Sequence, residues 1–288
     1  MAEKGYTLKT HNIITAWETE HFGVDIPHRF KPPVIFYTPK IKSELYDKTI
    51  VDLGGVSYTS YDIERVKTKI TRKTKVIIPV NLYGQKVNLE KLRKTIGNKI
   101  NIIEDSAQSH FAFYGKKKKI QSNNLAQASC YSFYPAKNLG AFGDGGLITT
   151  NNQSIYKKLL ALRNLGSTIK NKHSLIGLNS RLDTIQAVVL NNKLKSIFRL
   201  NEKRRVIGKY YDKLLKKIKE VKLTFTDNGS TRHLYVIRVK NREKLFDYMK
   251  SENILCQIHY PYSLNKLSAF KYKINKIKLK NSEVWAKE

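Results

Sequence analysis

The chain has 288 residues, a length that suits one large domain or two modest domains with a sizeable buried core. Hydrophobic residues make up 41% of the chain, which excludes a disordered protein, and its two cysteines, Cys130 and Cys256, are too few and too far apart for a zinc cluster or a disulfide framework. Lys and Arg total 54 against 23 Asp and Glu, and the resulting net charge of +31 favours polyanionic partners.

The basic residues are spread along the whole chain, and no zinc finger, helix-turn-helix or RNA-binding aromatic motif accompanies them. We therefore expect nucleic acid not to be a partner despite the charge. The first residues lack the apolar stretch of a signal peptide, and no apolar run approaches the ~20 residues that span a membrane. These features predict a cytoplasmic protein without membrane contact and without a metal site.

Strand-like and helix-like patterns alternate from about residue 49. Asn88 is a typical helix cap and Gly97 a typical helix end, so a helix is expected between them. Short apolar runs predict four strands, and a second helix follows the last of them; the expected strands are 76–80, 100–105, 128–133 and 146–150, and the helix is 154–165. This alternation predicts an α/β domain with a mainly parallel sheet.

The second half of the chain has a different pattern. A long helical region is followed by short strands and one further helix, at 183–219, 222–226, 233–240, 242–252 and 254–260, of which only 183–219 and 242–252 are helical. This order predicts a smaller α+β unit. We thus divide the chain into a divergent N-terminal segment (1–48), a large-domain portion (49–192) and a C-terminal small domain (193–288).

An acid and a lysine each follow one of the predicted strands. Asp105 ends the apolar run at 100–105, and Lys137 lies just past 128–133. Because ligands bind at the carboxyl ends of parallel strands, both side chains are candidates for chemistry. Taken singly, each also has a structural reading, in which Asp105 caps a turn and Lys137 is one surface lysine among many.

Three known motifs fail on spacing or context. The serine before Lys137 is Ser132, too far back for a Ser-x-x-Lys pair. Tyr114 and Lys118 form a Tyr-x-x-x-Lys pair, but they lie in a lysine run, and no Gly-x-Gly-x-x-Gly fingerprint is present. The Gly-x-x-x-x-Gly-Lys-Ser/Thr loop of nucleotide-binding proteins is also missing from the sequence.

A carboxylate and a lysine at neighbouring strand ends do suit pyridoxal 5'-phosphate (PLP) chemistry. The lysine holds the cofactor as a Schiff base, and the acid pairs with the protonated pyridine nitrogen. The lysine must lose its charge to form the imine, so it needs a desolvated site.

The chain from about residue 49 to 288 resembles the DegT/DnrJ/EryC1/StrS family of PLP-dependent sugar aminotransferases. The matching motifs, in order, are TRKTKVIIPVNLYG at 71–84, IEDSAQ at 103–108, SFYPAKNLG at 132–140, GDGG at 143–146, NSR at 179–181 with QA at 186–187, and HYP at 259–261. The resemblance implies the fold-type I PLP-dependent transferase architecture, with an incomplete large domain because residues 1–48 match none of the family's motifs.

The resemblance also implies a role for each matching residue. Lys137 would carry the cofactor and shuttle the proton, and Asp105 would pair with the pyridine nitrogen. Gln108 would bond near the 3-oxygen of the ring and Ser132 would contact the phosphate. Asn179 would reach the cofactor phosphate of the partner subunit, since sites of the family are shared across a homodimer.

Arg181 and His259 are implied near the substrate. The implied reaction transfers an amino group from an amino acid, expected to be glutamate, to a nucleotide-linked keto sugar. An alternative remains open, because residues 1–48 lack the family's phosphate-binding loop. In that alternative the chain is an inactive remnant or fragment that acts as a binding partner or polyanion binder.

Overall fold

The computed structural model describes most of the chain beyond the N-terminal fifth. The described residues are 63–72, 74–113, 125–224, 227–268 and 279–288. The divergent segment 1–48, with the expected lack of a phosphate loop, lies outside them.

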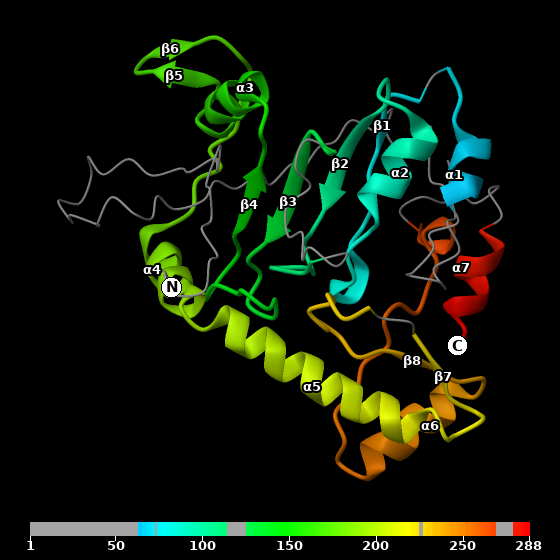
Figure 1. Ribbon diagram of the computed structural model, residues 1–288. Coiled ribbons are helices and arrows are strands. Elements are labelled where there is room, and N and C mark those ends of the chain that lie inside the picture. The colour runs from blue at the N-terminus through cyan, green and yellow to red at the C-terminus, as the bar shows by residue number, and fades with distance from the viewer. Residues whose placement is uncertain (1–62, 73, 114–124, 225–226, 269–278) are drawn as a thin grey trace.

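A four-stranded sheet forms the centre of the molecule (Figure 1). Its strands lie side by side in chain order, as β1 (Val76–Ile77), β2 (Asn101–Asp105), β3 (Ala128–Ser132) and β4 (Gly146–Thr149). The first three strands are parallel, and β4 is antiparallel to β3, with Ser132 opposite Gly146. The predicted α/β class with a mainly parallel sheet is confirmed.

Two helices pack on the β1–β2 side of this sheet, namely α1 (Ile63–Lys69) and α2 (Leu89–Ile96). Asn88 caps α2 by accepting a hydrogen bond from the Lys91 amide at 2.9 Å, and Gly97 ends the helix with a φ of 70°. Alternation along β2 turns Ile102 into the core between sheet and helices, which is formed by Val66, Val87, Leu89, Leu92, Ile102 and Ala126.

A second hydrophobic core joins the loop that follows β3 to two consecutive helices and to the segment just before them. Its buried residues are Phe133, Leu139, Ala141, Leu182, Ala187, Leu190 and Ile197. The helices are α4 (Thr184–Leu194) and α5 (Ile197–Leu215), so the predicted helical region 183–219 is interrupted at Lys195 and Ser196. Along the chain, β4 is followed by α3 (Gln153–Arg163), the helix expected at 154–165. A hairpin of β5 (Ser167–Ile169) and β6 (Lys172–His173) comes next, and the sequence did not indicate this hairpin.

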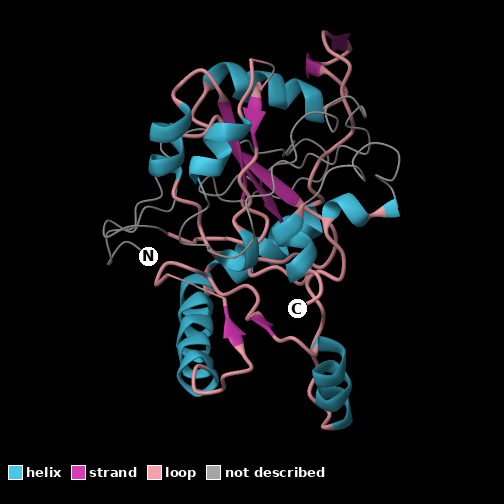
Figure 2. Cartoon of the chain, turned by 90° about the vertical axis from the view of Figure 1, so that its right-hand side faces the viewer, coloured by secondary structure: helices cyan, strands magenta, loops and turns pink. Residues whose placement is uncertain are grey.

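The C-terminal part lies below the sheet in Figure 2 and contains a small second sheet between helices. That sheet pairs β7 (Lys222–Leu223) with β8 (Ile237–Arg238), shorter than the strands predicted there. The remaining elements are α6 (Arg242–Ser251) and the short helices η4 (Leu82–Gly84), η5 (Leu264–Lys266) and α7 (Lys280–Trp285).

The predicted strand at 254–260 is wrong. These residues are described, yet they form no strand and pair with neither β7 nor β8, which make a sheet of two strands. Leu255 and Tyr260 are instead exposed to solvent. An apolar, β-prone run thus became a loop for want of a pairing partner.

Candidate functional site

The carboxyl ends of β2 and β3 meet at one edge of the sheet, because the two strands are parallel and in register from Ile103–Ala128 to Asp105–Cys130. Asp105 is fixed there by its backbone: its amide donates to the Pro79 carbonyl at 2.9 Å, and its carbonyl accepts from the Asn81 amide at 2.8 Å. The half-buried carboxylate accepts a hydrogen bond from the Ala107 amide at 3.0 Å. The predicted position of Asp105 at a strand end is confirmed.

Lys137 lies in a tight loop after β3. Its amide donates to the Tyr134 carbonyl at 2.9 Å, and the Ala141 amide returns to the Phe133 carbonyl at 2.8 Å. A side chain at Gly140 would place its Cβ 2.3 Å from the Pro135 carbonyl oxygen, so only glycine allows the loop to close in this way.

Lys137 and Asp105 lie at the same edge of the sheet, near enough for the charge of Asp105 to act on the lysine. Burial lowers the pKa of Lys137 below its ordinary value, and the charge of Asp105 partly opposes that shift. The structure therefore brings the two principal candidates together, with the lysine in a partly desolvated position.

Gln108 is held by a tyrosine from the preceding loop and by one from the C-terminal part. Its Oε1 accepts from the Tyr83 amide at 2.5 Å, and its Nε2 lies 3.2 Å from the Tyr260 hydroxyl. The Tyr83 hydroxyl in turn donates to the His259 carbonyl at 2.7 Å. Gln108 and His259 therefore belong to one cluster, although they lie far apart in the sequence.

In the described part of the chain, the three other candidate residues, Ser132, Asn179 and Arg181, make no hydrogen bond to Gln108 or His259. Ser132 Oγ, at the end of β3, accepts from the Tyr134 amide at 3.2 Å. Asn179 forms an isolated bridge with Asn164, and both Asn179 and Arg181 are exposed ahead of α4. Among the described residues, neither of these two side chains bonds to another candidate residue, and the role of Asn179 in a partner subunit stays a prediction.

The sequence interpretation missed two histidines. Burial lowers the pKa of His110 to about 3, with repulsion from His233 and Lys137. Neither ring nitrogen of His110 makes a hydrogen bond to a described residue, and the ring packs against Tyr131 at 5.6 Å between centroids. Its place two residues after Gln108 was the one available signal.

His233 approaches from the C-terminal part. Burial lowers its pKa to about 4, with repulsion from Lys137, Arg204 and His259. Its Nδ1 lies 2.9 Å from Oδ1 of Asn138, the residue next to Lys137. No local pattern marks His233, because its neighbours come from distant parts of the chain.

A buried ion pair lies directly behind Asp105. Glu104 Oε1 accepts from Lys86 Nζ at 2.5 Å and from Asn81 Nδ2 at 2.8 Å, and Oε2 accepts from Ser129 Oγ at 2.7 Å. Burial alone would raise the pKa of Glu104, but Lys86 and these hydrogen bonds bring it below the ordinary value.

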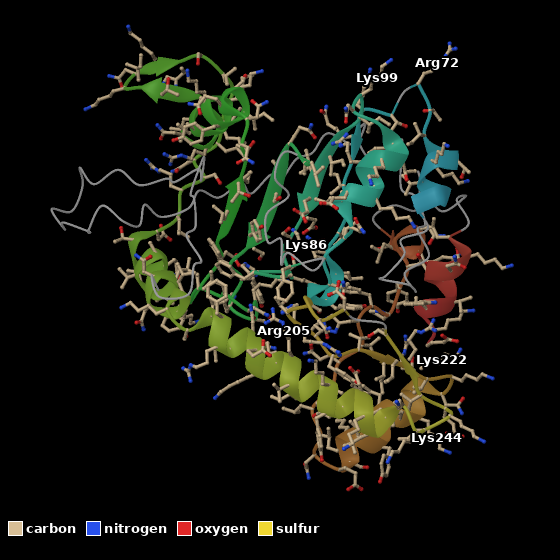
Figure 3. All side chains as sticks on the ribbon, in the orientation of Figure 1. Arg72, Lys86, Lys99, Arg205, Lys222 and Lys244 are labelled. Atoms are coloured by element: carbon tan, nitrogen blue, oxygen red, sulfur yellow. The ribbon has the colours of Figure 1, made fainter. Side chains whose placement is uncertain are left out.

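Lys86 is one of three buried lysine and arginine residues in the part of the chain that the structure describes, together with Arg163 and Arg232. Figure 3 shows it in the interior of the molecule, whereas Arg72, Lys99, Lys222 and Lys244 project outwards. Lys86 retains only 3% of its exposure. The interior cation is thus used to neutralise Glu104.

Residues 63–288, apart from their gaps, contain no group of three or more His, Cys, Asp or Glu side chains able to hold a metal ion. No helix in the same part of the chain is both long and apolar enough to cross a bilayer.

Comparison with known proteins places these features in context. The model of the DegT/DnrJ/EryC1/StrS aminotransferase family matches residues 46–288. The dTDP-3-amino-3,6-dideoxy-alpha-D-galactopyranose transaminase of Aneurinibacillus thermoaerophilus is 42% identical over 216 residues, which cover 73% of this chain and 58% of that protein.

Solved structures are also similar to this chain. DesV of S. venezuelae, in complex with a ketimine intermediate, superposes with a TM-score of 0.73 at 32% identity, covering 78% of this chain and 61% of DesV. NtdA of Bacillus subtilis, with bound cofactor PMP, gives 0.69 at 25% identity, covering 78% and 53%. The fold is that of fold-type I PLP aminotransferases, as predicted. The chain spans about six-tenths of the length of the curated relatives it matches.

Proposed function

Because the chain belongs to the DegT/DnrJ/EryC1/StrS aminotransferase family, we propose that it is a PLP-dependent aminotransferase acting on a nucleotide-linked keto sugar. The amino donor is an amino acid, which we expect to be glutamate. The proposal for the sugar is supported by the relative from Aneurinibacillus thermoaerophilus, whose name specifies a dTDP-linked amino sugar. A homodimer in the cytoplasm belongs to the same proposal.

The observation that carries this proposal is the position of Asp105 at the end of β2 and of Lys137 just past β3, at the same edge of the sheet, where the charge of Asp105 acts on the lysine. When bound, PLP supplies an electron sink for the loss of a proton from the substrate carbon. A partly desolvated amine and a carboxylate at neighbouring strand ends are the donor set that such a cofactor requires, so the residues present fit it.

Each residue then has a definite task. Lys137 would hold the cofactor, and its lowered pKa favours the neutral amine that can accept a proton at Nζ. Asp105 would pair with the ring nitrogen. Ser132 would bind the phosphate and Gln108 would orient the ring, while Arg181 and His259 would contact the substrate.

Reductive trapping tests the proposal directly. The purified chain is incubated with PLP and sodium borohydride, and the modified lysines are located by peptide mass spectrometry. We expect the reduced adduct on Lys137, absent from Lys137→Arg and unaffected by Lys99→Arg, which alters an exposed lysine.

Adducts scattered evenly over surface lysines would contradict the proposal and favour the inactive alternative. Formation of 2-oxoglutarate from glutamate in the presence of a dTDP-linked keto sugar would then test the reaction itself, with Lys137→Arg as the inactive control.

A further inference from the structure

The side chain of Asn138 joins three separate parts of the chain. Its Nδ2 donates to Asn201 Oδ1 at 2.8 Å and to the Thr231 carbonyl at 3.3 Å, and its Oδ1 faces His233 Nδ1 at 2.9 Å. Asn201 lies on α5, and Thr231 and His233 belong to the segment before β8. The residue next to Lys137 is therefore the point where the loop, the long helix and the C-terminal part meet.

The surroundings of this junction are buried and hydrogen-bonded. Thr231 and Asn201 retain 0% and 1% of their exposure, and Asn201 Nδ2 donates onward to the His110 carbonyl at 3.0 Å. The Thr231 amide also donates to the Gly84 carbonyl at 3.0 Å. A buried network in which every member is bonded restricts its parts to one arrangement.

The network also fixes the protonation of His233. Asn138 Nδ2 is occupied by two carbonyl-type acceptors, so Oδ1 faces the imidazole and His233 Nδ1 must carry the proton. With a pKa of about 4, the ring is neutral near pH 7 and its Nε2 is left with a lone pair.

We infer that Asn138 is a positioning residue for the candidate site. Through its three hydrogen bonds it holds the Lys137 loop against the C-terminal part and holds His233 with its proton on Nδ1. The significance of this arrangement for catalysis rests on the proposed function of Lys137, but the arrangement itself does not require a bound cofactor.

The expected consequence is that Lys137 stays partly buried and that its pKa stays below the ordinary value. Among the described residues, Asp105 from β2 acts on the pKa of Lys137, and Lys137 in turn lowers the pKa of His110 and of His233. Near pH 8 both histidines are neutral, so the loop's burial is the main factor that lowers the lysine pKa, and releasing the loop raises it.

The test measures Lys137 in the full chain without cofactor. Each variant is labelled with a trace of acetic anhydride between pH 6 and 11, and peptide mass spectrometry gives the acetylation of Lys137 relative to Lys99. A half-unit rise in pKa lowers the neutral fraction, and so the labelling rate at pH 8, by about threefold. We expect at least this loss in Asn138→Leu.

Paired variants at His233 separate positioning from titration. His233→Asn retains an amide N–H where Nδ1 lies and can still donate to Asn138, so Lys137 should keep the wild-type profile. His233→Leu removes the donor and should reproduce the shift of Asn138→Leu. Asn152→Ala, which removes the helix cap bonded to the Ile155 amide at 3.0 Å, controls for a general loss of stability and should leave the profile unchanged.

Identical profiles in wild type and folded Asn138→Leu, or an equal shift in Asn152→Ala, would overturn the inference. The outcome is distinct from that of the proposed function: a chain without a reduced PLP adduct on Lys137 would refute the function, yet the variants would still report on the Asn138 junction.

Discussion

At the scale of single residues, the buried ion pair between Lys86 and Glu104 should contribute strongly to the free energy of unfolding. Removing one partner of a buried ion pair typically costs about 3–5 kcal/mol, because the other charge is left without compensation. We expect Lys86→Met to lower the free energy of unfolding by this amount in urea denaturation. The double variant Lys86→Met/Glu104→Gln should recover part of the loss, and a double variant no more stable than Lys86→Met would contradict this account.

His110 should make the free energy of unfolding depend on pH, at pH values above those at which carboxylates titrate. Its folded pKa of about 3 lies below the unfolded value of ~6.5, so the unfolded chain binds the proton first as pH falls. Its contribution is complete above pH 6.5 and declines by up to about 1.4 kcal/mol per pH unit between there and the folded pKa.

The measurement is the urea midpoint between pH 7 and 4.5. His110→Phe should flatten the decline, with the smaller effect of His233 remaining, whereas His173→Gln, at an exposed histidine, should not. A wild-type slope retained in His110→Phe would show that this ring is not the group being titrated.

The principal residues were predictable because their signal is local. Asp105 ends an apolar strand, and Lys137 lies in a compact motif of aromatic residues and glycines. Asn138 and His233 were not predictable, since they meet only when segments 95 positions apart pack together. Their roles depend on tertiary contacts, which leave no spacing in the sequence.

At the scale of elements, Arg93 connects the end of α2 to the sheet. Its guanidinium donates to the carbonyls of Leu125, Gly97 and Ile100 at distances from 2.7 to 3.2 Å. A lysine has one donor group and cannot reach all three acceptors in this planar arrangement.

We expect Arg93→Lys to lower the free energy of unfolding by roughly 1.5–3 kcal/mol, the contribution of a hydrogen bond to a charged group. The same exchange at exposed Arg72 is the control and should change it by less than about 0.5 kcal/mol. Equal effects at the two positions would exclude the proposed connection.

Element boundaries were predictable where a typical capping residue marks the end of a helix. Asn88 and Gly97 delimit α2 as expected. The break between α4 and α5 was not predictable, because Lys195 and Ser196 are ordinary helix residues and the helix ends through a tightened last turn, with the Lys195 amide bonded to the Asn192 carbonyl. The strand predicted at 254–260 failed because the availability of a neighbouring strand is not encoded in the run itself.

For the whole molecule, the net charge of +31 opposes the compact state. Screening shortens the reach of this repulsion from about 30 Å at 0.01 M salt to about 8 Å at 0.15 M. The urea midpoint should therefore rise with sodium chloride over this range.

A charge-reduced variant provides the comparison. Lys203→Glu/Lys213→Glu changes two exposed residues of α5 and lowers the net charge by two at each position, to +27. Its midpoint should be higher at low salt and rise less steeply than that of the wild type. A midpoint independent of salt would show that the dispersed lysines are already neutralised by their local surroundings.

The position of Thr231 has a consequence for the order of folding. The four-stranded sheet and the Lys137 loop are complete in sequence by residue 149, but Thr231 supplies hydrogen bonds to both Gly84 and Asn138. Loop closure over such a separation comes late, since its entropy cost precedes the contacts that offset it. During synthesis, the sheet can therefore form while the lysine loop is still unsecured, and the site matures only when the C-terminal segment docks.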